Sequence, residues 1–575
     1  MNTNTQNIQK QFTQPGTNDA LKIISLGSFG EVTQNMFVYE FAPQGNFSKS
    51  QIIIVDCGVG FPEEDEFGVD LQIPDTTYLE DKKDRIQAII ITHGHEDHIG
   101  AIRFVLPILG QNIPIYAPKL ATAFIQERLI EAGQKARINT YDRSSIVKLD
   151  NFYIKPVAVN HSIPDTFHLS IKTSLGVFYH GSDFKFDFFP IDGKHADYEA
   201  ISRIGNDENV VCLLSDCLGS DHEGFSPSEA SIAEKFEYEI KTGKGRVFVT
   251  SISSNILRWK QAIEYGKRNG RKIVVVGFSV DKAIKIAQEL GYIKLNKEDI
   301  VPIERIKNFR DNQLIFLVAG FAGQPTSALS KIVMGKHRIK ISKGDKVIFS
   351  SPDYIPGTTS GIYKMIDNLA KMGAEVTYGK DEAIHVSGHG YQKDHALLIS
   401  LLRPKYILPI GGNYRHIRAY QLMCQQLGRS DDQFILPEPD EVVTFRHNRF
   451  DTNSKISLRK VLIDGFGIGD VGATVLRDRR TLAEDGMFSV VLLVDTAQGK
   501  LIKEPVLLSR GFVFAKENQE LLNLLKSEIM EKFREYVGKP MNVEFVRQKI
   551  QGHLEESIFK HTGRQPMILP LLIEV

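Results

Sequence analysis

The chain has 575 residues, of which 42% are hydrophobic and 24% charged, and its 70 Lys and Arg balance its 70 Asp and Glu. At roughly 100–200 residues per domain, this length predicts about three domains with apolar cores. A net charge of zero excludes a strongly basic coat protein. A nucleic-acid partner would therefore have to be held in a local basic groove.

Cysteine usage and apolar runs indicate the compartment. Cys57, Cys212, Cys217 and Cys424 contain no C-x-x-C pair, which excludes a disulfide framework and a cysteine zinc site and fits a reducing compartment. The polar first twenty residues lack the apolar stretch of a signal peptide, and no apolar run has the length of a membrane span. We therefore predict a cytoplasmic protein with no membrane partner.

Residues 1–20 are rich in Asn, Gln and Thr and are predicted to be disordered. Residues 21–215 then mix short β-branched runs with helical patterns, which predicts a layered α/β lobe with sheets inside. A helix at 99–106 would be ended by Pro107 and Gly110. The strands expected in this lobe are at 22–26, 36–40, 52–56, 89–92, 153–159 and 177–180.

Residues 216–379 alternate strands with helices, which is typical of a parallel sheet and predicts a second α/β domain. Its first helix, at 227–241, would be opened by Ser226. The polar segment 451–457 breaks the pattern, so we place a linker at 451–460. Residues 461–575 predict a small α+β domain. Its helices are expected at 518–536 and 546–559, before a last strand at 567–575.

One short segment carries most of the chemical information. It reads Thr92-His93-Gly94-His95-Glu96-Asp97-His98 and directly follows a predicted strand. Two His at i and i+2 in an extended turn can point at one ion, and Asp97 and His98 can reach a second ion beside it. Neutral imidazole and carboxylate suit zinc or manganese. A purely structural role for all four side chains is the weaker interpretation.

These four side chains cannot fill two coordination spheres, so other loops must supply ligands. His161 and Asp183 both follow predicted strands, at positions where a rim site would lie. Taken alone, His161 could cap a turn, and Asp183 could be an ordinary turn or N-cap residue. Asp56, at the end of another strand, is a candidate to orient a ligating His.

The motifs together resemble ribonuclease J, of the β-CASP group of metallo-β-lactamase nucleases. Besides the His93–His98 motif, the likeness includes His161-Ser-Ile-Pro-Asp165 and His385-Val-Ser-Gly-His389, and it extends from about residue 21 to residue 575. The other matching segments are 68–75, 84–100, 183–187, 212–216, 224–229, 253–256 and 566–570.

This resemblance implies an α/β fold: a metallo-β-lactamase αββα sandwich at 21–215 and 380–450, an inserted β-CASP α/β domain at 216–379, and a small α+β C-terminal domain. It implies degradation of RNA from a 5′-monophosphate end in the 5′→3′ direction, together with internal cleavage. Single-stranded RNA would be the substrate, and the chain would form a homodimer or homotetramer.

The resemblance also implies a set of functional residues. Two Zn²⁺ per subunit are expected, with Mn²⁺ or Mg²⁺ as alternatives. The first ion would take His93, His95, His161 and Asp183, and the second would take Asp97, His98 and Asp183. Asp97 would position the attacking water, and His389 would act as a proton donor or a phosphate clamp. Substrate would contact Ser253, Ser254, Asn255, His385, Val386, Ser387, Gly388 and His389. The alternative for Ser253–Asn255 is a helix N-cap, which can hold at the same time.

The chain departs from the family pattern at one ligand position and in two loops. Gly411 stands where the family places a His that ligates the second metal, so that a water or His416 would have to take its place. The loop at 320–325 lacks the usual polar residues, and the segment at 27–30 is also unusual. These changes support a rival interpretation, a catalytically weakened RNA-binding subunit.

Two further interpretations stay open. Another metallo-β-lactamase hydrolase, such as a lactonase or a DNA-directed nuclease, shares the metal motif. Lys185, Arg258, Lys260 and Arg415 are candidates to contact the RNA backbone, although each one alone is as readily a solvated surface charge.

Overall fold

The computed structural model describes residues 18–27, 29–63, 65–351, 359–379, 382–447, 449–465, 467–513 and 518–575. The chain separates into two compact units. The first contains the residues up to Phe61 together with Leu71–Val461, and the second contains Pro62–Asp70 and Leu462–Val575. Among the described residues, no helix is long and apolar enough to cross a membrane.

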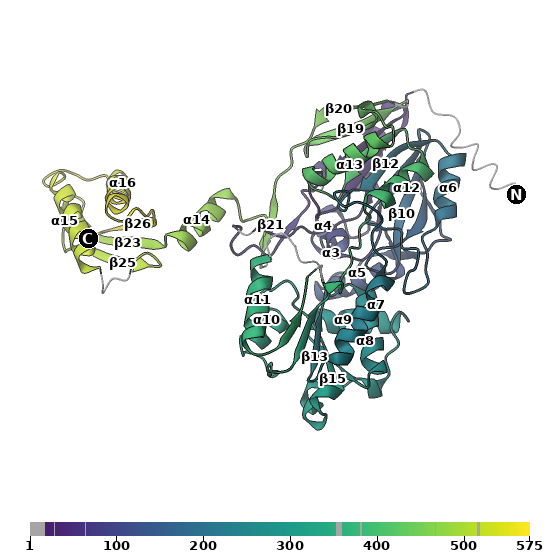
Figure 1. Cartoon of the computed structure of the whole chain (residues 1–575). Helices are drawn as coiled ribbons and strands as arrows, with labels where there is room; N and C mark the ends of the chain where they lie inside the picture. Colours follow the sequence, from purple (N-terminus) through teal and green to yellow (C-terminus); the bar gives the residue numbers. More distant parts are fainter. Residues whose placement is uncertain are drawn as a thin grey trace. The chain divides into compact units, whose positions relative to one another are not determined.

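The first lobe of the larger unit is a sandwich of two sheets (Figure 1). The first sheet has the order β20-β19-β1-β2-β3-β5-β6-β7 and the second β18-β12-β11-β10-β9-β8. Inward side chains of both sheets, such as Ile53 and Leu169, form one buried core. The outer face of the second sheet is covered by α6 (Tyr198–Asp207), α12 (Gln392–Leu402) and α13 (Tyr414–Gln426). The predicted αββα sandwich is therefore present.

The strands of this lobe have the following bounds: β1 Ala20–Ser25, β2 Phe37–Ala42, β3 Gln51–Val55, β5 Ile86–Ile90, β6 Ile115–Pro118, β7 Ile138–Tyr141, β8 Val147–Lys148, β9 Tyr153–Val159, β10 Thr166–Thr173, β11 Gly176–Gly181, β12 Val210–Asp216, β18 Tyr406–Ile410, β19 Glu441–Arg446 and β20 Arg449–Lys455.

Two boundaries of the first lobe differ from prediction. Residues 1–17, most of the segment expected to be disordered, lie outside the described residues. Ala20 belongs to β1, and the buried Asp19 accepts hydrogen bonds from Gln44 N and Ser174 Oγ. The predicted linker at 451–460 is wrong in its first half, because β20 pairs with β19 there. Polar residues fit this strand because it lies at an edge of the sheet, half open to water.

The single helix predicted after His98 is in fact two helices with other bounds. These are α3 (Glu96–Ile99) and α4 (Ile102–Leu109), and Pro107 lies inside α4. Proline removes the hydrogen bond to the carbonyl four residues earlier. Here Gln134 Nε2 donates to that carbonyl, Arg103 O, at 2.8 Å, so the helix continues to Gly110.

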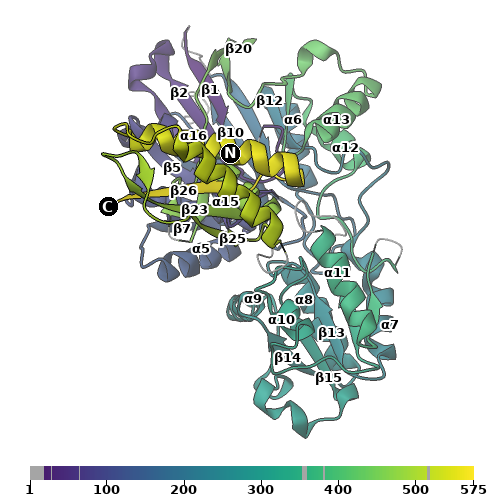
Figure 2. The same cartoon turned by 90° about the vertical axis from the view of Figure 1, so that its left-hand side faces the viewer.

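The inserted domain is built on a five-stranded sheet in which every strand pair is parallel, in the order β14-β15-β13-β16-β17 (Figure 2). Two buried clusters, one including Trp259 and the other Phe316, pack helices on its two faces. The elements are α7 Ala233–Thr242, β13 Val247–Thr250, α8 Ile256–Arg268, β14 Lys272–Val276, α9 Phe278–Glu289, β15 Leu314–Val318, α10 Ala328–Val333, β16 Lys346–Phe349, α11 Thr359–Lys371 and β17 Glu375–Thr377. The predicted opening at Ser226 is wrong, because Ser228 caps a 3-10 turn at Glu229–Ile232 that leads into α7.

The second unit is a small α+β domain. The strand β23 (Met487–Asp495) pairs with β24 (Lys500–Leu501), β25 (Val506–Arg510) and β26 (Met567–Glu574). The helices α15 (Gln519–Arg534) and α16 (Val543–Thr562) pack on the sheet through residues such as Phe488 and Leu525. The helix α14 (Ala473–Glu484) was not predicted, and none of its side chains is buried.

Candidate metal centre

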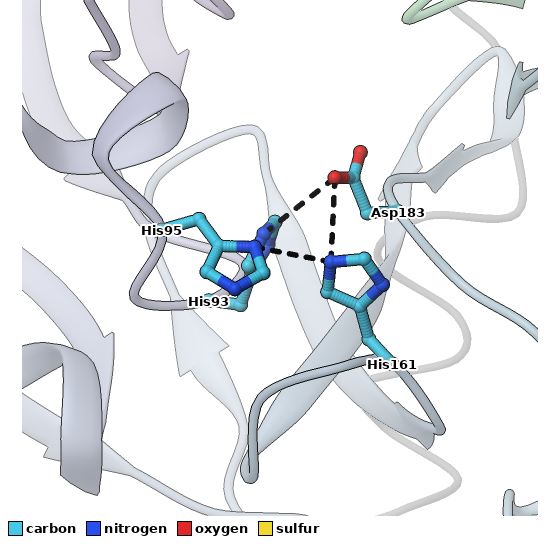
Figure 3. A group of neighbouring side chains, drawn as sticks. All are labelled: His93, His95, His161 and Asp183. Atoms are coloured by element: carbon cyan, nitrogen blue, oxygen red, sulfur yellow. Dashed lines mark hydrogen bonds and ion pairs between the residues drawn. The ribbon is translucent and has the colours of Figure 1, made fainter. Parts of the chain in front are cut away.

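Four side chains from three strand ends form the first group of candidate ligands (Figure 3). His93 and His95 follow β5, His161 follows β9 and Asp183 follows β11. Their ligand atoms all lie within 4.8 Å of one another. His161 Nε2 lies 3.0 Å from His95 Nδ1, and Asp183 Oδ2 lies 3.7 Å from His93 Nε2 and 3.6 Å from His161 Nε2. These are the four residues that the family resemblance implies for the first ion.

The chemistry of this group fits a divalent cation. Burial lowers the pKa of His93 and His95 well below the usual value and lowers that of His161 to about 4, so all three imidazoles are neutral. Neutral imidazole is the form that binds metal. His93 Nε2 is buried and makes no hydrogen bond with any described residue. An unpaired buried nitrogen facing a carboxylate is costly without a ligand, and a cation between them would satisfy both.

Asp97, His98 and Asp183 form a second group that shares Asp183 with the first. His98 Nε2 lies 3.4 Å from Asp183 Oδ1 and 3.5 Å from Asp97 Oδ2. Although burial opposes it, the carboxylates of Asp183, Asp97 and Asp56 raise the pKa of His98 well above its usual value. Burial also raises the pKa of Asp97 to about 6. Because the two oxygens of Asp183 face different groups, this carboxylate is placed to bridge two cations.

Asp56 orients a ligand of the second group without belonging to that group. It follows β3, and its Oδ2 lies 2.8 Å from His98 Nδ1. The same carboxylate accepts hydrogen bonds from Thr92 N at 2.7 Å and Thr92 Oγ1 at 2.8 Å. It therefore fixes the ring of His98 and the start of the His93 turn together, which is the role that its place at a strand end suggested.

Asp216 is a functional candidate that the sequence did not reveal. It ends β12, and its Oδ2 lies 2.8 Å from His389 Nδ1. The other ring nitrogen of His389, Nε2, lies 3.9 Å from Asp183 Oδ2. Although burial opposes it, Asp216 and Asp183 raise the pKa of His389 to about 9. The available signal was an acidic residue after a buried strand, the same signal that singled out Asp56.

The loop at 384–389 closes one side of the centre. His161 Nδ1 donates to Gly388 O at 2.7 Å, and His389 N donates to Ser387 Oγ at 3.0 Å. A Cβ at position 388 would lie 2.7 Å from His161 Cε1, so this close approach needs glycine. Of the predicted substrate residues, Gly388 and His389 thus lie against candidate ligands. His385 is half-buried, and Val386 is buried.

Ser253, Ser254 and Asn255 lie at the start of α8. Asn255 is buried and accepts a hydrogen bond from Arg258 N at 3.0 Å, which confirms the N-cap interpretation. Ser253 Oγ lies 2.8 Å from Ser279 Oγ, and Ser253 O accepts a hydrogen bond from Trp259 Nε1. A role for the three residues in phosphate binding stays a prediction.

Two of the four predicted RNA contacts are wrong. The side chains of Lys185 and Arg258 are 0% exposed and both lie beside Glu229, so neither can reach a solvent-borne phosphate. The sequence alone does not show that both residues pair with Glu229, because Glu229 is distant from them in the chain. Lys260 is partly exposed and Arg415 is exposed.

His416 does not replace the missing ligand at position 411. Its Nδ1 accepts a hydrogen bond from Asn413 N, which caps α13, and its Nε2 faces Asp221 at 3.6 Å. Gly411 has φ of +64°, and a Cβ there would approach Asp216 Oδ1 at 3.5 Å. The second group therefore has three candidate ligand residues among the described part of the chain.

Four family models match successive parts of the chain. They are the beta-lactamase superfamily domain at 52–199, the ribonuclease J beta-CASP domain at 244–369, the Zn-dependent metallo-hydrolase RNA specificity domain at 376–435 and the ribonuclease J C-terminal domain at 474–575. A crystal structure of a protein of unknown function from Enterococcus faecalis is similar in fold, with a TM-score of 0.51 and 14% sequence identity. It covers 74% of this chain and 100% of that one.

Curated relatives match over nearly the full length. The chain is 34% identical to ribonuclease J2 of Bacillus subtilis, over 96% of this chain and 99% of that protein. It is 35% identical to ribonuclease J 1 of Streptococcus pyogenes, over 97% and 99%. It is 33% identical to ribonuclease J of Thermus thermophilus, over 98% and 96%. With relatives at 33–35% identity over nearly the full length, the chain belongs to the ribonuclease J family of metallo-β-lactamase fold proteins.

Proposed function

We propose that this chain is a metal-dependent ribonuclease that hydrolyses phosphodiester bonds of single-stranded RNA. The observation that carries the proposal is the pair of ligand groups that meet at Asp183, beside the loop with Gly388 and His389. The match to an RNA specificity domain at 376–435, which contains that loop, supports RNA over a lactone or DNA substrate.

We propose two cations per chain, with Zn²⁺ in the first group. Three neutral imidazoles and one carboxylate are a donor set that zinc prefers. The second group, with two carboxylates and one imidazole, is richer in oxygen and suits Mn²⁺ or Mg²⁺ as well. Bound there, the cations would lower the pKa of a water and stabilise negative charge on a phosphate oxygen.

The protein side chains would hold and orient the reacting groups. Asp97, which is one-fifth exposed, is placed to accept a hydrogen bond from the attacking water. In the metal-free chain, Asp216 and Asp183 outweigh burial and raise the pKa of His389 to about 9. A protonated His389 would donate that proton to the leaving oxygen or clamp a phosphate. Ser387 and Gly388 would contact the phosphate backbone beside it.

We further propose 5′→3′ degradation from a 5′-monophosphate end, in the cytoplasm. The direction of degradation is implied by the family resemblance, and the compartment is inferred from the cysteine usage. The rival function is that of an RNA-binding subunit with weak catalysis, and Gly411 is the observation that favours it. That position offers no side chain, and His416 does not compensate.

Purified chain should release mononucleotides from a 5′-monophosphorylated single-stranded RNA when Zn²⁺, Mn²⁺ or Mg²⁺ is supplied. His98→Ala, which removes a ligand of the second group, should abolish this release. A matched control is His195→Ala, because His195 is exposed and belongs to neither ligand group. Tight RNA binding without cleavage under any metal would overturn the enzyme and leave the subunit as the function.

We also propose self-association through the second unit. Leu508 and Leu569 both pair with Ser489, and Val506 and Leu571 both pair with Val491, so these side chains share one face of the sheet. All four are exposed, at 43–55%. An apolar sheet face of this kind is typical of an interface. Leu571→Glu should shift the chain to a smaller species in light scattering, and an unchanged mass would exclude this face.

A further inference from the structure

Lys185, Glu229 and Arg258 form a buried charged cluster at the base of the loop at 384–389. Glu229 Oε2 accepts a hydrogen bond from Arg258 Nη2 at 2.6 Å, and Glu229 Oε1 lies 3.5 Å from Lys185 Nζ. The side chains of the two cations are 0% exposed and that of Glu229 is 2% exposed. Lys185 belongs to the sandwich lobe, and the other two residues belong to the inserted domain.

The two cations of the cluster hold the loop by its carbonyl groups. Lys185 Nζ donates to Ser387 O at 3.0 Å and to Pro227 O at 3.0 Å. Arg258 Nη1 donates to Ile384 O at 3.4 Å. The carbonyl after Ser387, Gly388 O, accepts the hydrogen bond from the candidate ligand His161. The cluster therefore sets where the loop lies relative to the metal centre.

The segment at 183–187 connects the cluster to the centre directly. Lys185 forms an isolated β-bridge with Asn160, the residue before His161. Two residues before Lys185, Asp183 faces the other candidate ligands. Two residues after it, Asp187 Oδ2 accepts a hydrogen bond from Glu229 N at 2.9 Å. A displacement of Lys185 would therefore move a bridging ligand and the loop together.

Stability alone is a poor reason for such a cluster. Removing charges from water is costly, and hydrophobic replacements of buried ion pairs are often neutral or stabilising. Within the described residues, Glu229 Oε1 and Arg258 Nε also lack hydrogen-bond partners. The charged side chains donate directed hydrogen bonds to the loop carbonyls, which apolar side chains cannot do.

We propose that Lys185, Glu229 and Arg258 are positioning residues that hold Ser387 and Gly388 in register with the metal centre for RNA phosphate binding. This inference rests on the proposed ribonuclease function. The three residues would act through the loop and through the segment that carries Asp183, without touching ion or RNA.

Lys185→Met is the sharpest test. It leaves Glu229 paired with Arg258, so no buried charge loses its partner. Lys346→Met is a matched control. Lys346 is 3% exposed and pairs with Glu239 at 2.8 Å. The substitution would leave Glu239 paired with Lys235. Lys346 also lies at the opposite end of β16 from Ser350, whose Oγ donates to Ile384 O.

Two quantities should be measured beside the melting temperature. One is the Kd of the EDTA-treated chain for 5′-phosphorylated single-stranded RNA, and the other is kcat/KM on the same RNA with metal. Lys185→Met should lower kcat/KM by about 100-fold, the scale expected for a misplacement of about 1 Å, and should raise Kd. Lys346→Met should change neither quantity, and the melting temperatures of the two variants should be similar.

Arg258→Met is the second variant, for the case that Lys185→Met does not fold. It leaves Lys185 with Glu229 and should shift Kd and kcat/KM in the same direction. Wild-type Kd and kcat/KM in a folded Lys185→Met or Arg258→Met chain would overturn the positioning role while the ribonuclease function stands. An inactive wild-type chain that still binds RNA would instead contradict the ribonuclease function.

Discussion

At the scale of single residues, the centre depends on carboxylates that act on more than one partner. Asp183 faces both ligand groups, Asp56 holds His98 and Thr92, and Asp216 holds His389. Each of these acids follows or ends a buried strand, where the sheet fixes its backbone. Side chains with several fixed partners have few alternative rotamers, so the ligand geometry is in place before metal binds.

Asp56→Asn should weaken binding of the second cation. The amide keeps the shape of the side chain, but it cannot hold the ring of His98 as strongly as the carboxylate at 2.8 Å does. Loss of such a partner typically costs about 10- to 100-fold in metal affinity or activity. Titration calorimetry with Mn²⁺ would measure this change, and an unaltered second binding step would contradict the role of Asp56.

Acid should destabilise the metal-free chain partly through His168. Burial lowers the pKa of His168 to about 3, and its Nε2 lies 3.1 Å from Ser182 O, next to Asp183.

 The pKa of His168 in the folded chain is thus below its value of about 6.5 in the unfolded chain, and the folded ring stays neutral between these two pH values. The unfolded chain therefore binds more protons in this range, and the stability from His168 is complete above about pH 6.5 and is lost as pH falls toward 3. His168→Gln should flatten the fall of the melting temperature between pH 6.5 and pH 4 in EDTA. An equally steep fall in the variant would contradict this assignment.

At the scale of elements, loops at strand ends carry the site, and their close contacts depend on small residues. The loop at 384–389 is held by His161 through Gly388 O and by Ser350 through Ile384 O. The inserted domain and the sandwich lobe both contribute to these contacts. The position of this loop is therefore a product of packing between elements that are distant in sequence.

Gly388→Ala should lower affinity for the first cation by at least about 10-fold, because the new Cβ would lie 2.7 Å from His161 Cε1 and displace that ring. Gly361→Ala is the matched control. Position 361 lies in α11, a Cβ there meets nothing closer than 3.7 Å, and alanine in a helix should add about 0.5–1 kcal/mol of stability. Zinc titration of both variants checks this prediction, which fails if Gly388→Ala binds zinc as the wild type does.

At the scale of the whole molecule, the sequence predicted most of the architecture because strong local patterns agree with it. The parallel sheet of the inserted domain follows from strand and helix patterns of ordinary length, and residues 93–98 stand out by their spacing alone. His161 and Asp183 were predicted as ligands because the His93–His98 motif needs further ligands from other loops. In the structure their ligand atoms lie within 4.8 Å of those of His93 and His95.

Four of the errors share one physical cause, which is that partners distant in the chain decided the outcome. Gln134 donates a hydrogen bond to the carbonyl that Pro107 leaves unpaired. Glu229 pairs with Lys185 and Arg258 in the interior. The polar strand β20 pairs with β19. Asp216 was missed for the same reason, because its partner His389 lies 173 positions further along the chain. A single sequence shows none of these pairings before the chain folds.

The central claim is that one carboxylate, Asp183, joins two cation sites. The most direct test is to count the divalent ions bound by EDTA-treated chain after titration with Zn²⁺ or Mn²⁺, for wild type and Asp183→Asn. The account predicts two ions per wild-type chain and weakened binding of both in the variant, because Asp183 belongs to both ligand groups. Unchanged binding of both ions by a folded Asp183→Asn chain would contradict it.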